Sequence, residues 1–127
     1  MKNLKKIYIV DDDETYQFIT KIIIEETQSV SEIKTFMNGQ SALDSLEADM
    51  KAKVCPEIIF LDLTMPVMDG WRFLEKYTDS NFCPGVKIYI VSSSVNPVDV
   101  EKAKSITDVS DYILKPFTKE KFLSLIN

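Results

Sequence analysis

Short apolar runs alternate along the chain with longer segments in which apolar residues recur at helical spacing. The short runs predict five strands, at about Lys6–Val10, Glu32–Phe36, Ile58–Leu61, Val86–Val91 and Tyr112–Leu114. The longer segments predict five helices, at about Glu14–Thr27, Gln40–Met50, Gly70–Thr78, Val98–Ile106 and Lys119–Ile126. Strands that alternate with helices are typical of α/β proteins, so we expect a doubly wound, five-stranded parallel sheet covered by five helices.

Two of the predicted helices carry patterns that bear on packing. The first helix has four apolar residues close together on one side, and we expect them to face the sheet: Phe18, Ile19, Ile22 and Ile23. The segment Val98–Ile106 has a thin apolar face of Val100, Ala103 and Ile106 among charged residues. Because so little apolar area is available for burial, this helix is a candidate for a mobile element.

Polar residues follow four of the predicted strands at their carboxyl ends. They are Asp11, Asp12 and Asp13 after the first strand, Asp62 after the third, Ser92, Ser93 and Ser94 after the fourth, and Lys115 after the fifth. An aspartate in such a place can simply cap a helix, as we expect of Asp13, and serines are common in loops. In an open parallel sheet, however, ligands bind at the carboxyl ends of the strands. Polar residues at the ends of four strands therefore indicate a binding site at this edge.

The composition excludes several classes of function. A chain of 127 residues makes one domain with a sizeable core, and its net charge of −5 argues against a nucleic-acid partner. Because there is no histidine, Ser-His-Asp and Cys-His catalysis and histidine metal sites are ruled out. The chain has three glycines, which leave no GxGxxG fingerprint and no GxxxxGK[ST] phosphate loop.

The sequence also bears on location and on the state of its cysteines. No apolar run approaches the length of a bilayer span, and the first residues lead into a strand without a cleavable apolar segment, so we expect a cytoplasmic protein without membrane contact. Cys55 and Cys83 each precede a proline just ahead of an apolar strand, which predicts equivalent positions at the amino edge of the sheet. A disulfide is conceivable there, but in the cytosol we expect reduced thiols.

The residue types at the carboxyl edge favour phosphoryl transfer. Asp11, Asp12 and Asp62 make an oxygen-only site for a hard cation, and Mg²⁺ fits better than Zn²⁺, which prefers histidine or cysteine; Mn²⁺ could substitute. Asp62 would be the nucleophile. The cation and Lys115, the only cationic residue expected at this edge, would neutralise the phosphoryl oxygens, and Ser92 would donate a hydrogen bond to one of them.

The segment Ile58 to Gly70 contains the motif hydrophobic-Asp-x-x-Met-Pro-x-Met-Asp-Gly. With this motif, the acidic run that begins at Asp11 and the Lys115-Pro116 pair, the chain resembles the response regulator receiver domain of two-component signalling from about Lys5 to Ile126. The resemblance implies a flavodoxin-like fold with the strand order 2-1-3-4-5. It also implies a cis peptide bond between Lys115 and Pro116.

The resemblance also assigns roles to single residues. Asp11 and Asp12 match the acidic pair that holds Mg²⁺, with Asp12 as the direct ligand. Asp62 matches the phosphoacceptor, and the main-chain carbonyl of Thr64 matches the third protein ligand. Ser92 matches the hydroxyl residue after strand four, and Tyr112 matches the aromatic residue that switches with it on phosphorylation.

Two positions depart from the family pattern. Thr64 stands where asparagine is common, which bears on the lifetime of the phosphoryl group. The residues Val109, Ser110 and Asp111 replace a frequent Gly-Ala before the switch aromatic.

These features predict a stand-alone receiver domain over residues 1–127, without an output domain and without enzymatic activity beyond its own phosphorylation and dephosphorylation. The expected partners are a histidine kinase or histidine phosphotransfer protein and a downstream protein, contacted through the surface of the fourth helix, fifth strand and fifth helix. We expect a monomer or a weak phosphorylation-dependent dimer. The alternatives are a pseudo-receiver that binds partners without phosphorylation and, with less support, an aspartyl-phosphate phosphatase, which would need aspartate in place of Thr64.

Overall fold

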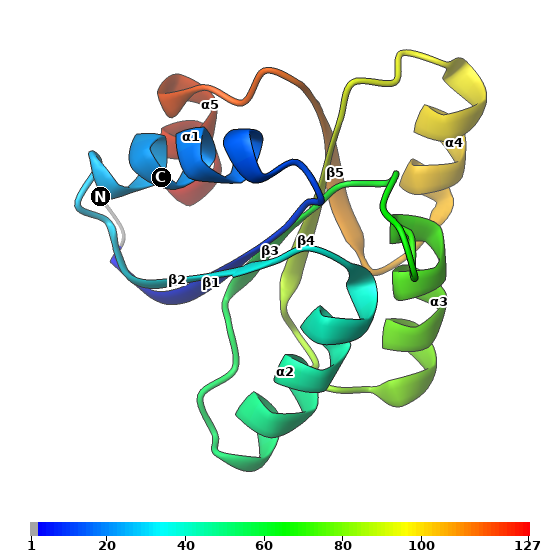
Figure 1. The fold of residues 1–127 in the computed structure, drawn as a ribbon, viewed down its shortest axis with the longest axis horizontal. Coiled ribbons are helices and arrows are strands. Elements are labelled where there is room, and N and C mark those ends of the chain that lie inside the picture. Colours follow the sequence, from blue (N-terminus) through cyan, green and yellow to red (C-terminus); the bar gives the residue numbers. More distant parts are fainter. Residues whose placement is uncertain (1–2) are drawn as a thin grey trace.

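The structure is a computed structural model that describes residues 3–127. Its five parallel strands form one sheet in the order β2-β1-β3-β4-β5 (Figure 1). The strands are β1 (Leu4–Val10), β2 (Val30–Phe36), β3 (Ile58–Leu61), β4 (Lys87–Ser92) and β5 (Val109–Leu114). The helices are α1 (Glu14–Glu25), α2 (Gly39–Lys51), α3 (Gly70–Ser80), α4 (Pro97–Ser105) and α5 (Lys119–Ile126). The predicted fold class, strand order and alternation of elements are confirmed, and element ends differ from the prediction by three residues or fewer.

Helices cover both faces of the sheet, which is why the central strands read as unbroken apolar runs. In Figure 1, α1 and α5 lie on one face, and α2, α3 and α4 lie on the other. Successive side chains of β1 point to opposite faces of the sheet. Tyr8 and Val10 belong to the core under α2 and α3, whereas Ile7 and Ile9 belong to the core under α1 and α5. Among residues 3–127, no helix is long and apolar enough to cross a membrane.

The inward face of α1 is not the one that the apolar pattern predicts. Phe18 is 64% exposed and Ile19 is 49% exposed, whereas Gln17, Thr20 and Ile24 are buried. The prediction for this helix is therefore wrong. Ile22 is exposed as well, Ile23 is half-buried, and the buried face carries the polar Gln17. The Gln17 amide donates hydrogen bonds to main-chain carbonyl oxygens at the ends of β1 and β2, and these bonds fix the rotation of the helix.

The helix α4 is as thinly packed as its sequence predicts. Ala103 is its one buried residue, whereas Val98 at its start is 69% exposed. Its contacts run mainly to β5, and Lys102 lies over the ring of Trp71 in α3, with 4.3 Å between the ammonium and the ring centroid. A helix that buries so little apolar area can shift at low cost in free energy.

The amino edge of the sheet carries a disulfide bond between Cys55 and Cys83. The expectation of reduced thiols is therefore wrong for this structure. The predicted placement of the two cysteines is confirmed, because each precedes a proline just before a strand and the two strands, β3 and β4, are neighbours. That pairing brings the two Cα atoms to 5.7 Å, within the range that a disulfide can span.

Candidate phosphoryl-acceptor site

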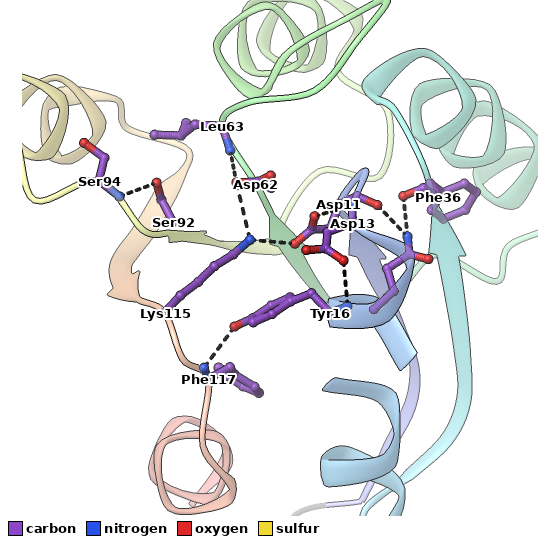
Figure 2. Close-up of polar contacts among 11 residues, drawn as sticks. Asp11, Asp13, Tyr16, Phe36, Asp62, Leu63, Ser92, Ser94, Lys115 and Phe117 are labelled. Carbon is purple, nitrogen blue, oxygen red and sulfur yellow. Dashed lines mark hydrogen bonds and ion pairs between the residues drawn. The ribbon is translucent and has the colours of Figure 1, made fainter. Parts of the chain in front are cut away.

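The carboxyl ends of β1, β3 and β5 bring three charged side chains together (Figure 2). Asp11 and Asp62 are 3% and 8% exposed, so both carboxylates are largely removed from water. The Lys115 ammonium donates a hydrogen bond to Asp11 Oδ2 at 3.0 Å and lies 3.9 Å from Asp62 Oδ1. One lysine thus faces two buried carboxylates, which leaves the site with an excess of negative charge.

Asp12 adds a third, exposed carboxylate to this group. Ligand oxygens of Asp11, Asp12 and Asp62 all lie within 4.8 Å of one another. Three carboxylates with an open, water-facing side match the preference of Mg²⁺ for oxygen ligands and retained waters. The donor set therefore fits the cation that the sequence predicts.

When no cation is bound, the surroundings of Asp62 make its carboxyl harder to ionise than a carboxyl in water. Burial raises the pKa of Asp62 to about 6, the charge of Asp11 adds to the effect, and Lys115 opposes it. Burial alone would lower the pKa of Lys115, but its hydrogen bond to Asp11 and the two carboxylate charges raise it above its ordinary value. Lys115 is therefore charged at neutral pH, and Asp62 gains from any further positive charge.

Local hydrogen bonds hold the acidic run after β1. Asp13 caps α1, as predicted, since its Oδ1 accepts a hydrogen bond from the Tyr16 N–H at 3.0 Å. The Asp13 N–H in turn donates to Asp11 Oδ1 at 2.9 Å. Gln17 Nε2 donates to the carbonyl oxygens of Asp11 and Phe36, at 2.8 and 2.6 Å. Gln17 was not predicted as part of the site, although an amide in the first turn of a helix that follows an acidic run is a signal for such a role.

The loop between β3 and α3 is built closely around the Asp62 backbone. The Leu63 N–H donates to Asp62 Oδ1 at 2.9 Å, and the Gly70 N–H donates to the Leu63 carbonyl at 2.8 Å. A Cβ at position 70 would lie only 2.5 Å from the Asp62 carbonyl oxygen, so this turn requires glycine. Asp69 caps α3. Thr64 lies in the same loop with its side chain exposed.

The end of β4 is tied to β5 through Ser92, Ser94 and Tyr112. Ser92 is 5% exposed, its hydroxyl accepts a hydrogen bond from the Ser94 N–H at 3.1 Å, and its carbonyl accepts one from the Lys115 N–H at 2.9 Å. The half-buried Tyr112 donates from its hydroxyl to the Ser94 carbonyl at 2.9 Å, and the Ser94 hydroxyl donates to Asp99 in α4 at 2.8 Å. Tyr112 thus contacts the loop that joins Ser92 to the thinly packed helix.

The Lys115–Pro116 peptide bond is cis. The loop that follows it contacts α1 through Tyr16, whose hydroxyl accepts a hydrogen bond from the Phe117 N–H at 2.9 Å. The Tyr16 ring also lies beside the Lys115 ammonium, 4.1 Å from Nζ to the ring centroid. Tyr16 was not predicted from the sequence, because no pattern along the chain links the first turn of α1 to the loop after β5.

Comparisons with known proteins agree with this geometry. The sequence model of the response regulator receiver domain matches residues 7–127, so the chain belongs to the response regulator receiver family. A protein-glutamate methylesterase/protein-glutamine glutaminase from Desulfotalea psychrophila is 33% identical over 119 residues, which cover 94% of this chain and 31% of that protein. The chain thus spans less than a third of the length of this relative.

Solved structures show the same fold. A two-component response regulator from Cytophaga hutchinsonii superposes with a TM-score of 0.89 at 29% identity, covering 98% of this chain and 95% of the other. A CheY-like response regulator receiver domain from Methanospirillum hungatei superposes with a TM-score of 0.79 at 26% identity, covering 98% and 91%. The resemblance to the receiver family and its flavodoxin-like sheet, read from the sequence, is confirmed.

Proposed function

We propose that the chain is a phospho-accepting receiver domain over its 127 residues and that Asp62 is its phosphoacceptor. The observation that carries the proposal is the placement of Asp62, a buried carboxylate at the end of a central strand, close to a second buried carboxylate and to the lysine that both carboxylates share. An Asp62 oxygen attacks the phosphorus of a phosphohistidine. The bond from phosphorus to the imidazole nitrogen breaks, that nitrogen keeps the electron pair, and an acyl phosphate forms on Asp62.

The neighbouring residues have separate roles in this proposal. Asp11, Asp12, Asp62 and the Thr64 carbonyl hold Mg²⁺, and Mn²⁺ can replace it. The metal, when bound, supplies positive charge to the phosphoryl oxygens. Lys115 neutralises a further oxygen, and Ser92 donates its hydroxyl proton to another. Asp12 is the ligand best placed to bind the cation directly, because its carboxylate is exposed while Asp11 is engaged with Lys115.

The phosphoryl donor is another molecule, because the chain contains no histidine. We assign this role to a histidine kinase or a histidine phosphotransfer protein in the cytoplasm. The protein catalyses its own phosphorylation and dephosphorylation and otherwise acts by binding. Nucleic acid and membrane are not expected among its partners.

The readout in this proposal begins at the loop after β4. New charge on Asp62 attracts the Ser92 hydroxyl, which displaces the loop that Tyr112 and Asp99 hold. Because α4 buries little apolar area, the loop can carry the helix with it. The surface of α4, β5 and α5 then binds a downstream protein or a second copy of the chain, in a weak dimer.

Intact mass tests the proposal directly. The protein is incubated with Mg²⁺ and acetyl phosphate beside Asp62→Asn and beside a sample with chelator. The proposal expects the gain of one phosphoryl group, absent from both controls. A gain that persists in Asp62→Asn would refute the assignment of the acceptor. No gain in protein that binds Mg²⁺, from acetyl phosphate or from a phosphohistidine protein, would favour a pseudo-receiver.

A further inference from the structure

Tyr16 joins the site to the loop that follows β5. It lies in the first turn of α1, half buried, and Figure 2 shows its side chain between Lys115 and Phe117. The face of its ring is 4.1 Å from the Lys115 ammonium, and its hydroxyl accepts a hydrogen bond from the Phe117 N–H at 2.9 Å. One side chain therefore contacts both the reactive end of Lys115 and the backbone two residues later.

The ring contact differs in kind from the other contacts of the lysine. Within residues 3–127, the Lys115 ammonium contacts Asp11 at 3.0 Å, Asp62 at 3.9 Å and the ring of Tyr16. The two carboxylates are also the groups that would bind the cation and accept the phosphoryl group. The aromatic face attracts the ammonium through its quadrupole without using a carboxylate oxygen. Of the three contacts, this one does not compete with the chemistry at Asp62.

A lysine needs such a contact because its four-carbon stem is flexible. Only 19% of the Lys115 side chain is exposed, so the ammonium and the ring meet in a partly desolvated place, where cation–π attraction is stronger than at the surface. The hydrogen bond from Phe117 to the Tyr16 hydroxyl fixes the ring from the other side. Together these contacts hold the lysine head at the edge of the site.

We propose that Tyr16 is a positioning residue for phosphoryl transfer: it keeps the Lys115 ammonium directed at Asp62 once the carboxylates are engaged. This inference rests on the proposed function. The ring carries the effect, and the hydroxyl supports it by holding the loop after β5.

The test separates the ring from the hydroxyl and both from general packing. Tyr16→Phe keeps the ring, Tyr16→Leu removes it, and each change is also made in a Lys115→Met background. Phe122→Leu is the matched control. Phe122 is a fully buried aromatic residue in the same core, with its ring 6.2 Å from that of Phe117.

Two measurements on each variant test the kinetic effect. The rate constant of phosphorylation at saturating acetyl phosphate and Mg²⁺ is followed by intact mass, over hours for the Lys115→Met proteins. The Mg²⁺ affinity is followed by the fluorescence of Trp71, which lies at the start of α3.

We expect Tyr16→Leu to lower the rate constant about ten-fold and Tyr16→Phe to stay within about three-fold of wild type. Mg²⁺ affinity should be unchanged in both. In the Lys115→Met background, Tyr16→Leu should cause no further loss. The proposal is overturned if Tyr16→Leu is phosphorylated as fast as wild type, or if it slows phosphorylation equally in the wild-type and Lys115→Met backgrounds. It is also overturned if Phe122→Leu slows phosphorylation as much as Tyr16→Leu does.

A spectroscopic readout tests the contact itself. The methylene protons beside the Lys115 ammonium should show a ring-current shift in wild type and in Tyr16→Phe that is lost in Tyr16→Leu. Equal shifts in all three proteins would refute the positioning role. A wild type that gains no phosphoryl group counts against the proposed function instead, and the ring-current shift then still decides whether Tyr16 holds Lys115.

Discussion

Replacing Asp62 by asparagine should stabilise the metal-free protein at neutral pH. The pKa of Asp62 is raised from 3.8 to about 6, mainly by burial. The folded protein therefore binds a proton at Asp62 more tightly than the unfolded chain does. Its stability is greatest where Asp62 is protonated in both states, falls as the pH rises from about 4 to about 6, and stays low above that window. Asparagine resembles the protonated carboxyl and lacks this loss.

The size of the effect follows from the shift. A difference of about two pKa units corresponds to about 3 kcal/mol, at about 1.4 kcal/mol per unit. Little discount for solvent applies, because the Asp62 side chain is only 10% exposed. In EDTA at pH 7.5, Asp62→Asn should therefore raise the free energy of unfolding by about 2–3 kcal/mol, and the gain should fade towards pH 4.

Urea unfolding at several pH values, with EDTA and then with Mg²⁺, measures this effect. Asp79→Asn removes one exposed carboxylate and is the control, with no change expected beyond a few tenths of a kcal/mol. Mg²⁺ should stabilise the wild type much more than Asp62→Asn, because the cation binds the ionised carboxylate. An asparagine variant less stable than wild type at pH 7.5 in EDTA, or a gain that does not depend on pH, would refute the reasoning.

Three further outcomes are expected. Reduction of the Cys55–Cys83 disulfide should lower the free energy of unfolding by about 3–4 kcal/mol, because the unfolded chain is then no longer constrained by a closed loop of 28 residues. Urea unfolding with and without reductant measures this loss. Gly70→Ala should slow phosphorylation at least about ten-fold, because its Cβ would meet main-chain atoms at 2.5 and 2.8 Å and displace the backbone of the proposed phosphoacceptor. Intact mass over time measures the rate, and a wild-type rate would contradict the packing. Asp49→Ala should lower stability by about 3–5 kcal/mol in thermal or urea unfolding, because it removes the closest partner of the buried Lys6 ammonium, and a loss below about 1 kcal/mol would contradict this.

The parts of the fold that could be read from the sequence are those set by local pattern and by the sheet as a whole. The run Ile58–Leu61 is apolar at every position because helices cover both faces of its strand, and this predicts a central strand. Parallel strands share their carboxyl edge, so Asp11, Asp62 and Lys115 could be expected to meet although they are far apart in the chain. The edge of the sheet, and not any single motif, made the site predictable.

The parts that could not be read depend on side-chain partners across elements. The pattern in α1 favours an inward Phe18, but two strand-end carbonyls need a donor, and Gln17 supplies it by facing inward. The contact of Tyr16 with Lys115 likewise requires α1 and the loop after β5 to lie side by side. Cys55 and Cys83 form a bond because their strands are neighbours, whereas the expectation of free thiols came from the compartment and not from the fold.

Asp62 and Asp49 are both buried, but their surroundings shift their pKa values in opposite directions. Burial alone would raise the pKa of Asp49, but hydrogen bonds from Tyr8, Lys6 and Lys34 outweigh it, so the pKa of Asp49 is lowered. Asp62 faces one lysine, shared with a second carboxylate, and its pKa is raised. A buried carboxylate that has enough hydrogen-bond donors and positive charges around it stabilises the fold. One that has too few of them is stabilised most by a bound cation or by accepting a phosphoryl group. The shortage of positive charge at Asp62 is therefore the feature that the proposed chemistry uses.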